Sequence, residues 1–163
     1  MILVDSHPKP ALTVTIVGER ASESFETLTS VLEKIKSAGL PLLGMSINHN
    51  SLILYLPMNG PDGLLEALHS IVLRDKRAVA LAVRKNLAFI RVRGVGLEET
   101  PGVISRITSA LNSAGINIYG IFTITSSVEL FVDLKDKEKA IELVGKALET
   151  NNNDEGSRLK GEI

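Results

Sequence analysis

The stretch Phe89–Ile118, FIRVRGVGLEETPGVISRITSALNSAGINI, decides the fold. Apolar and polar residues alternate over 89–93, which is typical of a strand. A glycine-rich turn follows, and apolar residues then recur at helical spacing over 103–114. Pro101 suits a first helical turn, and Gly115 suits the left-handed residue that ends a helix. The stretch therefore predicts a strand, a loop, a helix and a second strand.

The loop before this helix is a candidate binding site. The first turn of a helix has backbone N–H groups without an intrahelical partner, and the helix dipole places partial positive charge there. Such an end attracts a carboxylate or a phosphate. The small residues of the loop leave room for a ligand to approach.

Composition sets the limits for the rest of the chain. Its 163 residues are enough for one ordinary domain or two small ones, and 44% of them are hydrophobic, which allows a packed core. The net charge of −1 argues against a general polyanion binder. The absence of cysteine excludes disulfides and thiolate metal sites. No apolar run approaches the ~20 residues of a membrane helix, and the apolar start is too short for a signal peptide, so we expect a cytoplasmic protein.

The remaining elements follow from the same periodicities. We expect further strands at 1–4, 12–17, 42–47, 52–56, 78–83, 116–125 and 128–134. We expect further helices at 25–35, 61–71 and 136–148. Asn48–Ser51 is expected to form a hairpin turn, and Lys85–Asn86 a turn between two strands.

The chain contains an internal repeat. Ser37–Leu40 (SAGL) matches Ser113–Ile116 (SAGI) 76 positions later, and the same offset places Gly18 on Gly94 without a gap. A duplicated β-α-β-β-α unit explains this match. Each unit needs one more strand to complete a four-stranded antiparallel sheet.

The prediction is therefore an α+β fold with two ferredoxin-like βαββαβ units, helices lying on one face of each sheet. Residues 78–83 supply the last strand of the first unit. The N-terminal segment supplies that of the second, so the units are interleaved. The expected boundaries are 11–84 for the first unit, 85–149 with strand 1–5 for the second, and 150–163 for a flexible tail.

Three motifs carry a resemblance to a known family. They are Gly94-x-Gly96-x3-Thr100-Pro101-Gly102-Val103, the helix end and strand start within Ala110–Ile118, and Val128-x-Leu130-Phe131-Val132 followed by Lys139-Ala140. This pattern resembles an ACT domain, and more narrowly the second of the tandem ACT units in the regulatory region of aspartate kinase. The first unit departs from it, with Phe25-Glu26 in place of Pro-Gly and Pro41 in place of Asn117.

The resemblance implies a regulatory module that binds a small amino acid at an interface between units, with lysine or threonine suggested by the family. It further implies a homodimer formed by ACT pairing and, as a possible partner, a kinase catalytic subunit. We expect no catalytic residue, cofactor or metal site, because the chain has no nucleotide-binding signature and no room for a kinase domain. The effector site implied by the resemblance comprises Leu97, Glu98, Glu99, Thr100, Pro101, Gly102, Val103, Asn117, Ile118, Thr123 and Ser126.

The chemistry of these residues fits an amino-acid zwitterion. Amides around Gly102 and Val103 are the expected donors to its carboxylate. Glu98 or Glu99 is the expected acceptor for its ammonium group, and Asn117 offers both a donor and an acceptor. Gly102 lacks a Cβ, which lets a ligand approach the backbone closely.

Other classes of function are less consistent with the sequence. Gly94-x-Gly96-x-x-Glu99 mimics a dinucleotide fingerprint, but Glu99 would repel a pyrophosphate. Basic residues between Arg74 and Arg93 suggest nucleic-acid binding, yet only 4% of the chain is aromatic and a solvated face explains them better. The three histidines have no metal-ligand spacing. The main alternative is an ACT-fold protein-interaction module with no small-molecule ligand.

Overall fold

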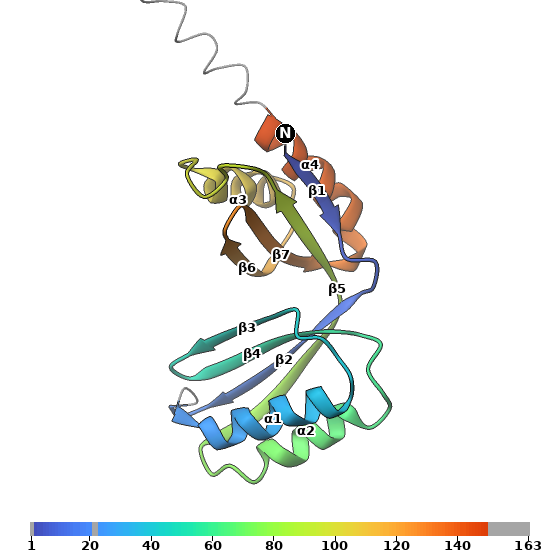
Figure 1. The fold of residues 1–163 in the computed structure, drawn as a ribbon, viewed down its shortest axis with the longest axis vertical. Coiled ribbons are helices and arrows are strands. Elements are labelled where there is room, and N and C mark those ends of the chain that lie inside the picture. The colour runs from blue at the N-terminus through green and yellow to red at the C-terminus, as the bar shows by residue number, and fades with distance from the viewer. Residues whose placement is uncertain (1, 21–22, 150–163) are drawn as a thin grey trace, which may run out of the picture. The chain divides into compact units, whose positions relative to one another are not determined.

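The structure is a computed structural model that describes residues 2–20 and 23–149 (Figure 1). The chain divides into two compact units, each described here by itself. The first unit is Lys9–Asn86, and the second unit is Met1–Pro8 with Leu87–Ile163. The predicted tail, 150–163, lies outside the described residues.

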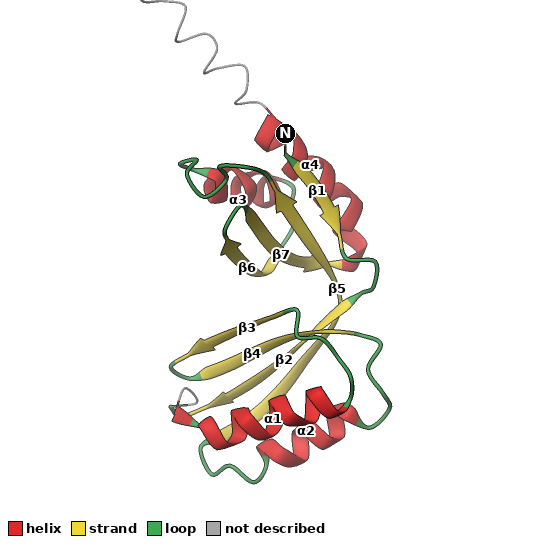
Figure 2. Cartoon of the chain, viewed as in Figure 1, coloured by secondary structure: helices red, strands yellow, loops and turns green. Residues whose placement is uncertain are grey.

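The first unit is an antiparallel sheet with two helices on one face (Figure 2). Its sheet has the strand order β3-β4-β2-β5. Alternate residues of β2 and β4 point to the helices and form the core, and Val14 lies opposite Leu54 in the β2–β4 register. The elements are β2 (Ala11–Gly18), α1 (Phe25–Ser37), β3 (Gly44–Asn48), β4 (Ser51–Pro57), α2 (Leu64–Val72) and the start of β5 (Ala78–Arg93).

The second unit repeats this arrangement with the strand order β1-β5-β7-β6, all antiparallel. Ile90 of β5 lies opposite Leu130 of β7, and both side chains are fully buried under the helices. Its elements are β1 (Leu3–Ser6), the end of β5, α3 (Val103–Ser113), β6 (Ile118–Ile124), β7 (Ser127–Asp133), the short 3₁₀ helix η2 (Leu134–Asp136) and α4 (Lys137–Glu149).

The predicted α+β fold with two interleaved ferredoxin-like units is confirmed. The N-terminal strand β1 pairs with β5, with Val4 opposite Val92, and so belongs to the second sheet. Ile2 and Val4 pack against the core of that unit. The polar segment His7–Pro10 then leads into the first unit.

The predicted turn at Lys85–Asn86 is wrong, because β5 runs without interruption from Ala78 to Arg93. Asn86 does have the left-handed backbone of a turn residue, with φ 60°, and its N–H donates to the Met58 sulfur at 3.1 Å. Asparagine tolerates this conformation better than most residues. The strand therefore continues through a local irregularity at Asn86. In the sequence, this irregularity resembles a turn between two strands.

The start of α2 also differs from the prediction. The helix begins at Leu64 rather than at Pro61. Gly63, with φ 79°, precedes it as the N-cap, a conformation that glycine adopts without strain.

The sheet face of the second unit that lies opposite the helices carries the aromatic side chains of Phe89 and Phe131. Their rings stack with centroids 4.7 Å apart, and Phe122 meets Phe131 edge-on at 6.3 Å. Phe131 is fully buried. Phe89 and Phe131 are direct partners in the β5–β7 register, so the sheet itself sets this stack.

Candidate functional site

The loop between β5 and α3 is a compact series of turns. The amides of Leu97, Glu99 and Thr100 donate to carbonyl groups three residues earlier, at 3.2–3.4 Å. The Thr100 hydroxyl donates to the Gly96 carbonyl at 2.7 Å. Gly96 has φ 78°, a conformation that L side chains rarely adopt. The glycine-rich turn predicted from the sequence is therefore held together by its own hydrogen bonds and leads directly into α3.

Helix α3 begins without a side-chain cap. Gly102, with φ 78°, is its N-cap residue, and within residues 2–20 and 23–149 no side chain donates or accepts a capping hydrogen bond there. The helical bonding starts with the Arg106 amide donating to the Gly102 carbonyl at 3.0 Å. The amides of the first turn therefore present their partial positive charge to whatever occupies the adjoining space.

Glu98 already has partners within the protein. Its carboxylate accepts the Ser126 amide at 2.9 Å and the Ser126 hydroxyl at 3.2 Å. Hydrogen bonds from its own amide and from Ser126 lower the pKa of Glu98 below its usual range. Glu98 thus fixes the turn between β6 and β7, where Ser126 has φ 59°. The carboxylate of Glu99 has no such contact with the described residues.

A hollow of about 290 Å³ lies in front of this helix start. It is bounded by the loop and by the ends of β6 and β7, so Thr123 joins Thr100 and Gly102 around one space. The structure therefore brings most of the predicted effector residues together. Apolar side chains, including Leu97 and Val103, form part of its wall.

Asn117 and Ile118 lie elsewhere. They line a shallow hollow of about 410 Å³ together with Thr108, Ser109 and Asn112, on the C-terminal half of α3. Within one chain Asn117 therefore does not share a space with Gly102. The sequence pattern groups these residues, but the fold places them toward opposite ends of the same helix.

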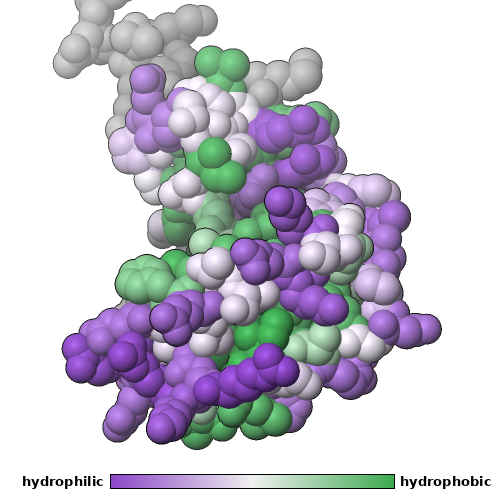
Figure 3. Space-filling model, turned by 60° about the horizontal axis from the view of Figure 1, so that its bottom comes forward, coloured by the Kyte–Doolittle hydropathy of each residue, from purple (hydrophilic) through white to green (hydrophobic). Residues whose placement is uncertain are grey.

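The first unit contains a larger hollow, about 620 Å³, that the sequence analysis did not identify. One wall is the start of α1, from Glu23 to Ser30, and the other is the connection between α2 and β5, including Arg74 and Lys76. Phe25, 67% exposed, stands at its edge. Figure 3 shows hydrophobic residues interspersed among hydrophilic ones on the face that it draws.

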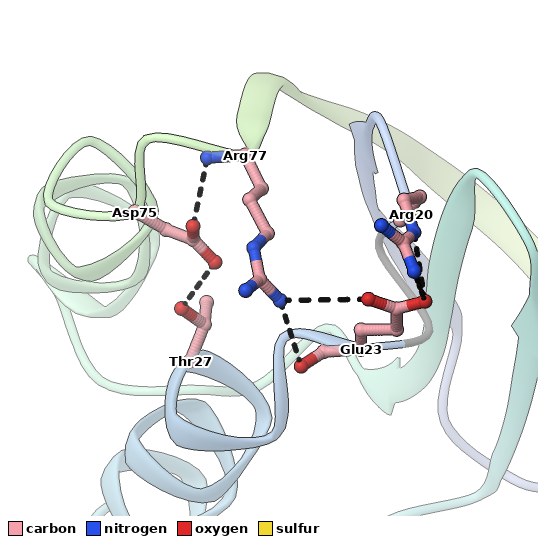
Figure 4. Close-up of polar contacts among 5 residues, drawn as sticks. All are labelled: Arg20, Glu23, Thr27, Asp75 and Arg77. Carbon is pink, nitrogen blue, oxygen red and sulfur yellow. Dashed lines mark hydrogen bonds and ion pairs between the residues drawn. The ribbon is translucent and has the colours of Figure 1, made fainter.

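A network of charged groups ties the two walls together (Figure 4). Asp75 accepts the Thr27 hydroxyl at 2.7 Å and the Arg77 amide at 2.8 Å, and these bonds lower the pKa of Asp75. Arg77 donates to the Glu23 carbonyl at 3.2 Å and lies 3.9 Å from its carboxylate, which also pairs with Arg20 at 2.6 Å. The contacts join segments about 50 positions apart, so no local motif could have revealed them.

Residues 2–20 and 23–149 lack two further classes of feature. No group of three or more histidine, aspartate or glutamate side chains is placed to hold a metal ion. No helix of this part of the chain is long and apolar enough to cross a membrane.

The geometry defines a tandem pair of βαββαβ units in which a loop and an uncapped helix start face a small hollow. Comparison with known proteins finds similarity to one family model and to several solved structures. Residues 82–145 match the family model described as an ACT domain. A search of curated protein sequences gives no match.

Solved structures share the fold of the whole tandem pair. The ligand-free regulatory subunit of aspartate kinase from Thermus thermophilus matches with a TM-score of 0.70 and 18% identity, over 90% of this chain and 95% of that one. A structure of aspartokinase alpha and beta subunits matches with a TM-score of 0.76 and 21% identity, over 91% and 97%. Aspartate kinase from Clostridium acetobutylicum matches with a TM-score of 0.77 and 19% identity, over 90% of this chain and 34% of that one.

Residues 82–145 thus match an ACT domain, and the fold of the tandem pair resembles the regulatory region of aspartate kinase, as the sequence motifs predict. It covers nearly the whole Thermus regulatory subunit but only about a third of the Clostridium enzyme. The match to the family model lies mainly in the second unit, where the Thr-Pro-Gly motif is found.

Proposed function

We propose that this chain is a regulatory module that senses a small amino acid and does not itself catalyse a reaction. The observation that carries the proposal is the uncapped start of α3, which opens onto the 290 Å³ hollow beside Thr100 and Thr123. An α-carboxylate there meets backbone N–H groups and the positive end of the helix dipole. The acceptor for the ammonium group is either Glu98, which lines the hollow but is bound to Ser126, or the neighbouring Glu99, which does not line it.

A second copy of the chain completes this site in our proposal. Gly102 and Asn117 do not share a hollow within one chain, yet Asn117 lies just before β6, which is at the end of the strand order. Sheet-to-sheet pairing at such an edge uses unpaired backbone groups. A homodimer of this kind sets Asn117 of one copy near the helix start of the other, and the amino acid is held between them.

The first unit offers a second place for an effector. Its 620 Å³ hollow also lies at a helix start, that of α1, and Arg74, Lys76 and Glu26 line it. Within the described residues these three side chains make no hydrogen bond or ion pair. They supply both signs of charge, which a zwitterion requires.

Regulation then follows from differential binding. An effector shifts an equilibrium between two arrangements of paired units only by the difference in its affinity for them. The natural recipient of such a shift is a kinase catalytic chain, because the Thermus structure is named as a regulatory subunit of aspartate kinase. Lysine and threonine are the first effectors to test.

The test is a melting-temperature screen against all common amino acids, followed by calorimetry. One amino acid should raise the melting temperature, and Gly102→Val and Asn117→Ala should each abolish the rise. Asn59→Ala, in an exposed loop of the first unit, should leave it unchanged. A complete panel without any shift would contradict the sensor and favour an ACT-fold module that binds only proteins.

A further inference from the structure

We propose that the first unit carries a separate ligand site for an amino acid with a short aliphatic side chain. The site is the hollow between the end of β4 and the start of α2. It contains none of the proposed effector residues of either unit, so this site is independent of the proposed function.

The floor of this hollow is apolar. Leu56 and Leu64, which are 1% and 6% exposed, belong to the core of the first unit, and the partly buried Leu40 and Met58 pack against that core. The volume is about 230 Å³. This is below the ~300 Å³ at which sites for drug-sized ligands begin, so only a small molecule fits. A branched aliphatic side chain matches such a floor in size and polarity.

The rim carries both signs of charge. Lys85 lines the hollow from β5, and Asp62 and Glu66 line it from the start of α2 and the loop before it. Within the described residues, the side chains of these three form no hydrogen bond or ion pair, although all border one space. Lys85 can pair with the α-carboxylate of a bound amino acid, and Asp62 or Glu66 can pair with its α-ammonium group. The rim thus suits a zwitterion better than a simple acid or amine.

The shape of the hollow depends on two residues. A Cβ on Gly60 would lie 3.0 Å from the Leu40 side chain and 3.1 Å from that of Leu64, so the glycine keeps this space open. The Met58 sulfur accepts the Asn86 amide at 3.1 Å, which holds the methionine in the wall. Gly60→Ala should therefore narrow the site without disturbing its charges.

The methyl group of Met58 provides a local probe. In the full chain labelled with ¹³C-methyl methionine, L-leucine at millimolar concentration should shift the Met58 signal saturably. Lys85→Gln should weaken this binding about tenfold, as expected for loss of a charge-assisted contact. Gly60→Ala should weaken it as well. Lys36→Gln, an exposed lysine of α1 away from the hollow, should have no effect.

Two analogues test the zwitterion itself. 4-Methylpentanoate lacks the ammonium group and 3-methylbutylamine lacks the carboxylate, so each should bind more weakly than L-leucine. Gly102→Val should leave the Met58 response intact, which separates this site from the proposed effector site. The proposal is overturned if Met58 does not respond to leucine, if Lys85→Gln binds as tightly as the parent chain, or if the analogues bind equally well.

Discussion

In each unit, one carboxylate forms hydrogen bonds near the start of the first helix, α1 or α3. Asp75 reaches from the segment after α2 to Thr27 in the first turn of α1, and Glu98 reaches from the loop before α3 to Ser126. Both carboxylates accept hydrogen bonds, and both have a lowered pKa for that reason. In each unit an acidic residue thus fixes a connection next to a hollow.

Asp75→Asn should destabilise the first unit by about 1 kcal/mol or less, because an amide accepts fewer hydrogen bonds and the site is partly solvated. The folded-state pKa of Asp75 lies below its unfolded value, so its stabilising effect is full above about pH 3.9 and disappears as pH falls through the folded pKa. Urea denaturation at several pH values should show the gap between parent and variant closing in acid. A gap that widens in acid would contradict this assignment.

Glu98→Gln should loosen the turn between β6 and β7. The Ser126 amide loses a charged acceptor, so its hydrogen exchange should speed up relative to that of core amides in β7. In the parent chain, acid below the lowered pKa of Glu98 should have the same effect. Glu149→Gln, on α4, is the matched control and should leave Ser126 unchanged.

At the scale of elements, alanine substitutions at two glycines are expected to have opposite effects on stability. A Cβ on Gly18, at the end of β2, would lie 2.0 Å from the Arg77 carbonyl oxygen next to the start of β5. A Cβ on Gly145, within α4, has nothing within 4 Å. Gly18→Ala should therefore destabilise the protein by about 2 kcal/mol, whereas Gly145→Ala should stabilise it by about 0.5–1 kcal/mol.

Thermal denaturation of the two variants beside the parent checks this pair. The same chemical change is made in both, so any difference reports the surroundings of each glycine. If Gly18→Ala melts at the parent temperature, β2 and the start of β5 do not approach as closely as the structure shows.

The elements were largely predictable because their periodicity records which residues are buried. The alternation in 89–93 and the helical spacing in 103–114 led directly to β5 and α3. Asn86 was wrongly predicted to lie in a turn. Asparagine is common at left-handed backbone positions, and such positions occur both in turns and in strand irregularities. The 620 Å³ hollow of the first unit was not predictable, because Glu23 and Arg77 are far apart in the sequence and come together only in the folded chain.

At the scale of the whole chain, the second unit depends on β1. Deleting residues 1–8 removes the apolar contacts of Ile2 and Val4, and the ion pairs of Asp5 with Arg91, at 3.4 Å, and Arg93. It also leaves one edge of β5 without a partner over 90–93.

Hydrogen exchange should therefore speed up at least about tenfold in β5 and β7 of the deletion variant, while β2 and β4 of the first unit keep their protection. Asp5→Asn is the milder comparison and should cost about 0.2–1 kcal/mol, the usual value for exposed ion pairs. Equal loss of protection in both units would show that they unfold as one.

The placement of β1 has a consequence for biosynthesis. Ribosomes make Leu3–Ser6 long before Leu87–Asp133, the region that holds its strand partner and the rest of that sheet. The first unit has all of its strands and helices once residue 86 has left the exit tunnel, and domains can fold as they emerge. The segment Leu3–Ser6 must therefore remain without its strand partner while the first unit can already fold.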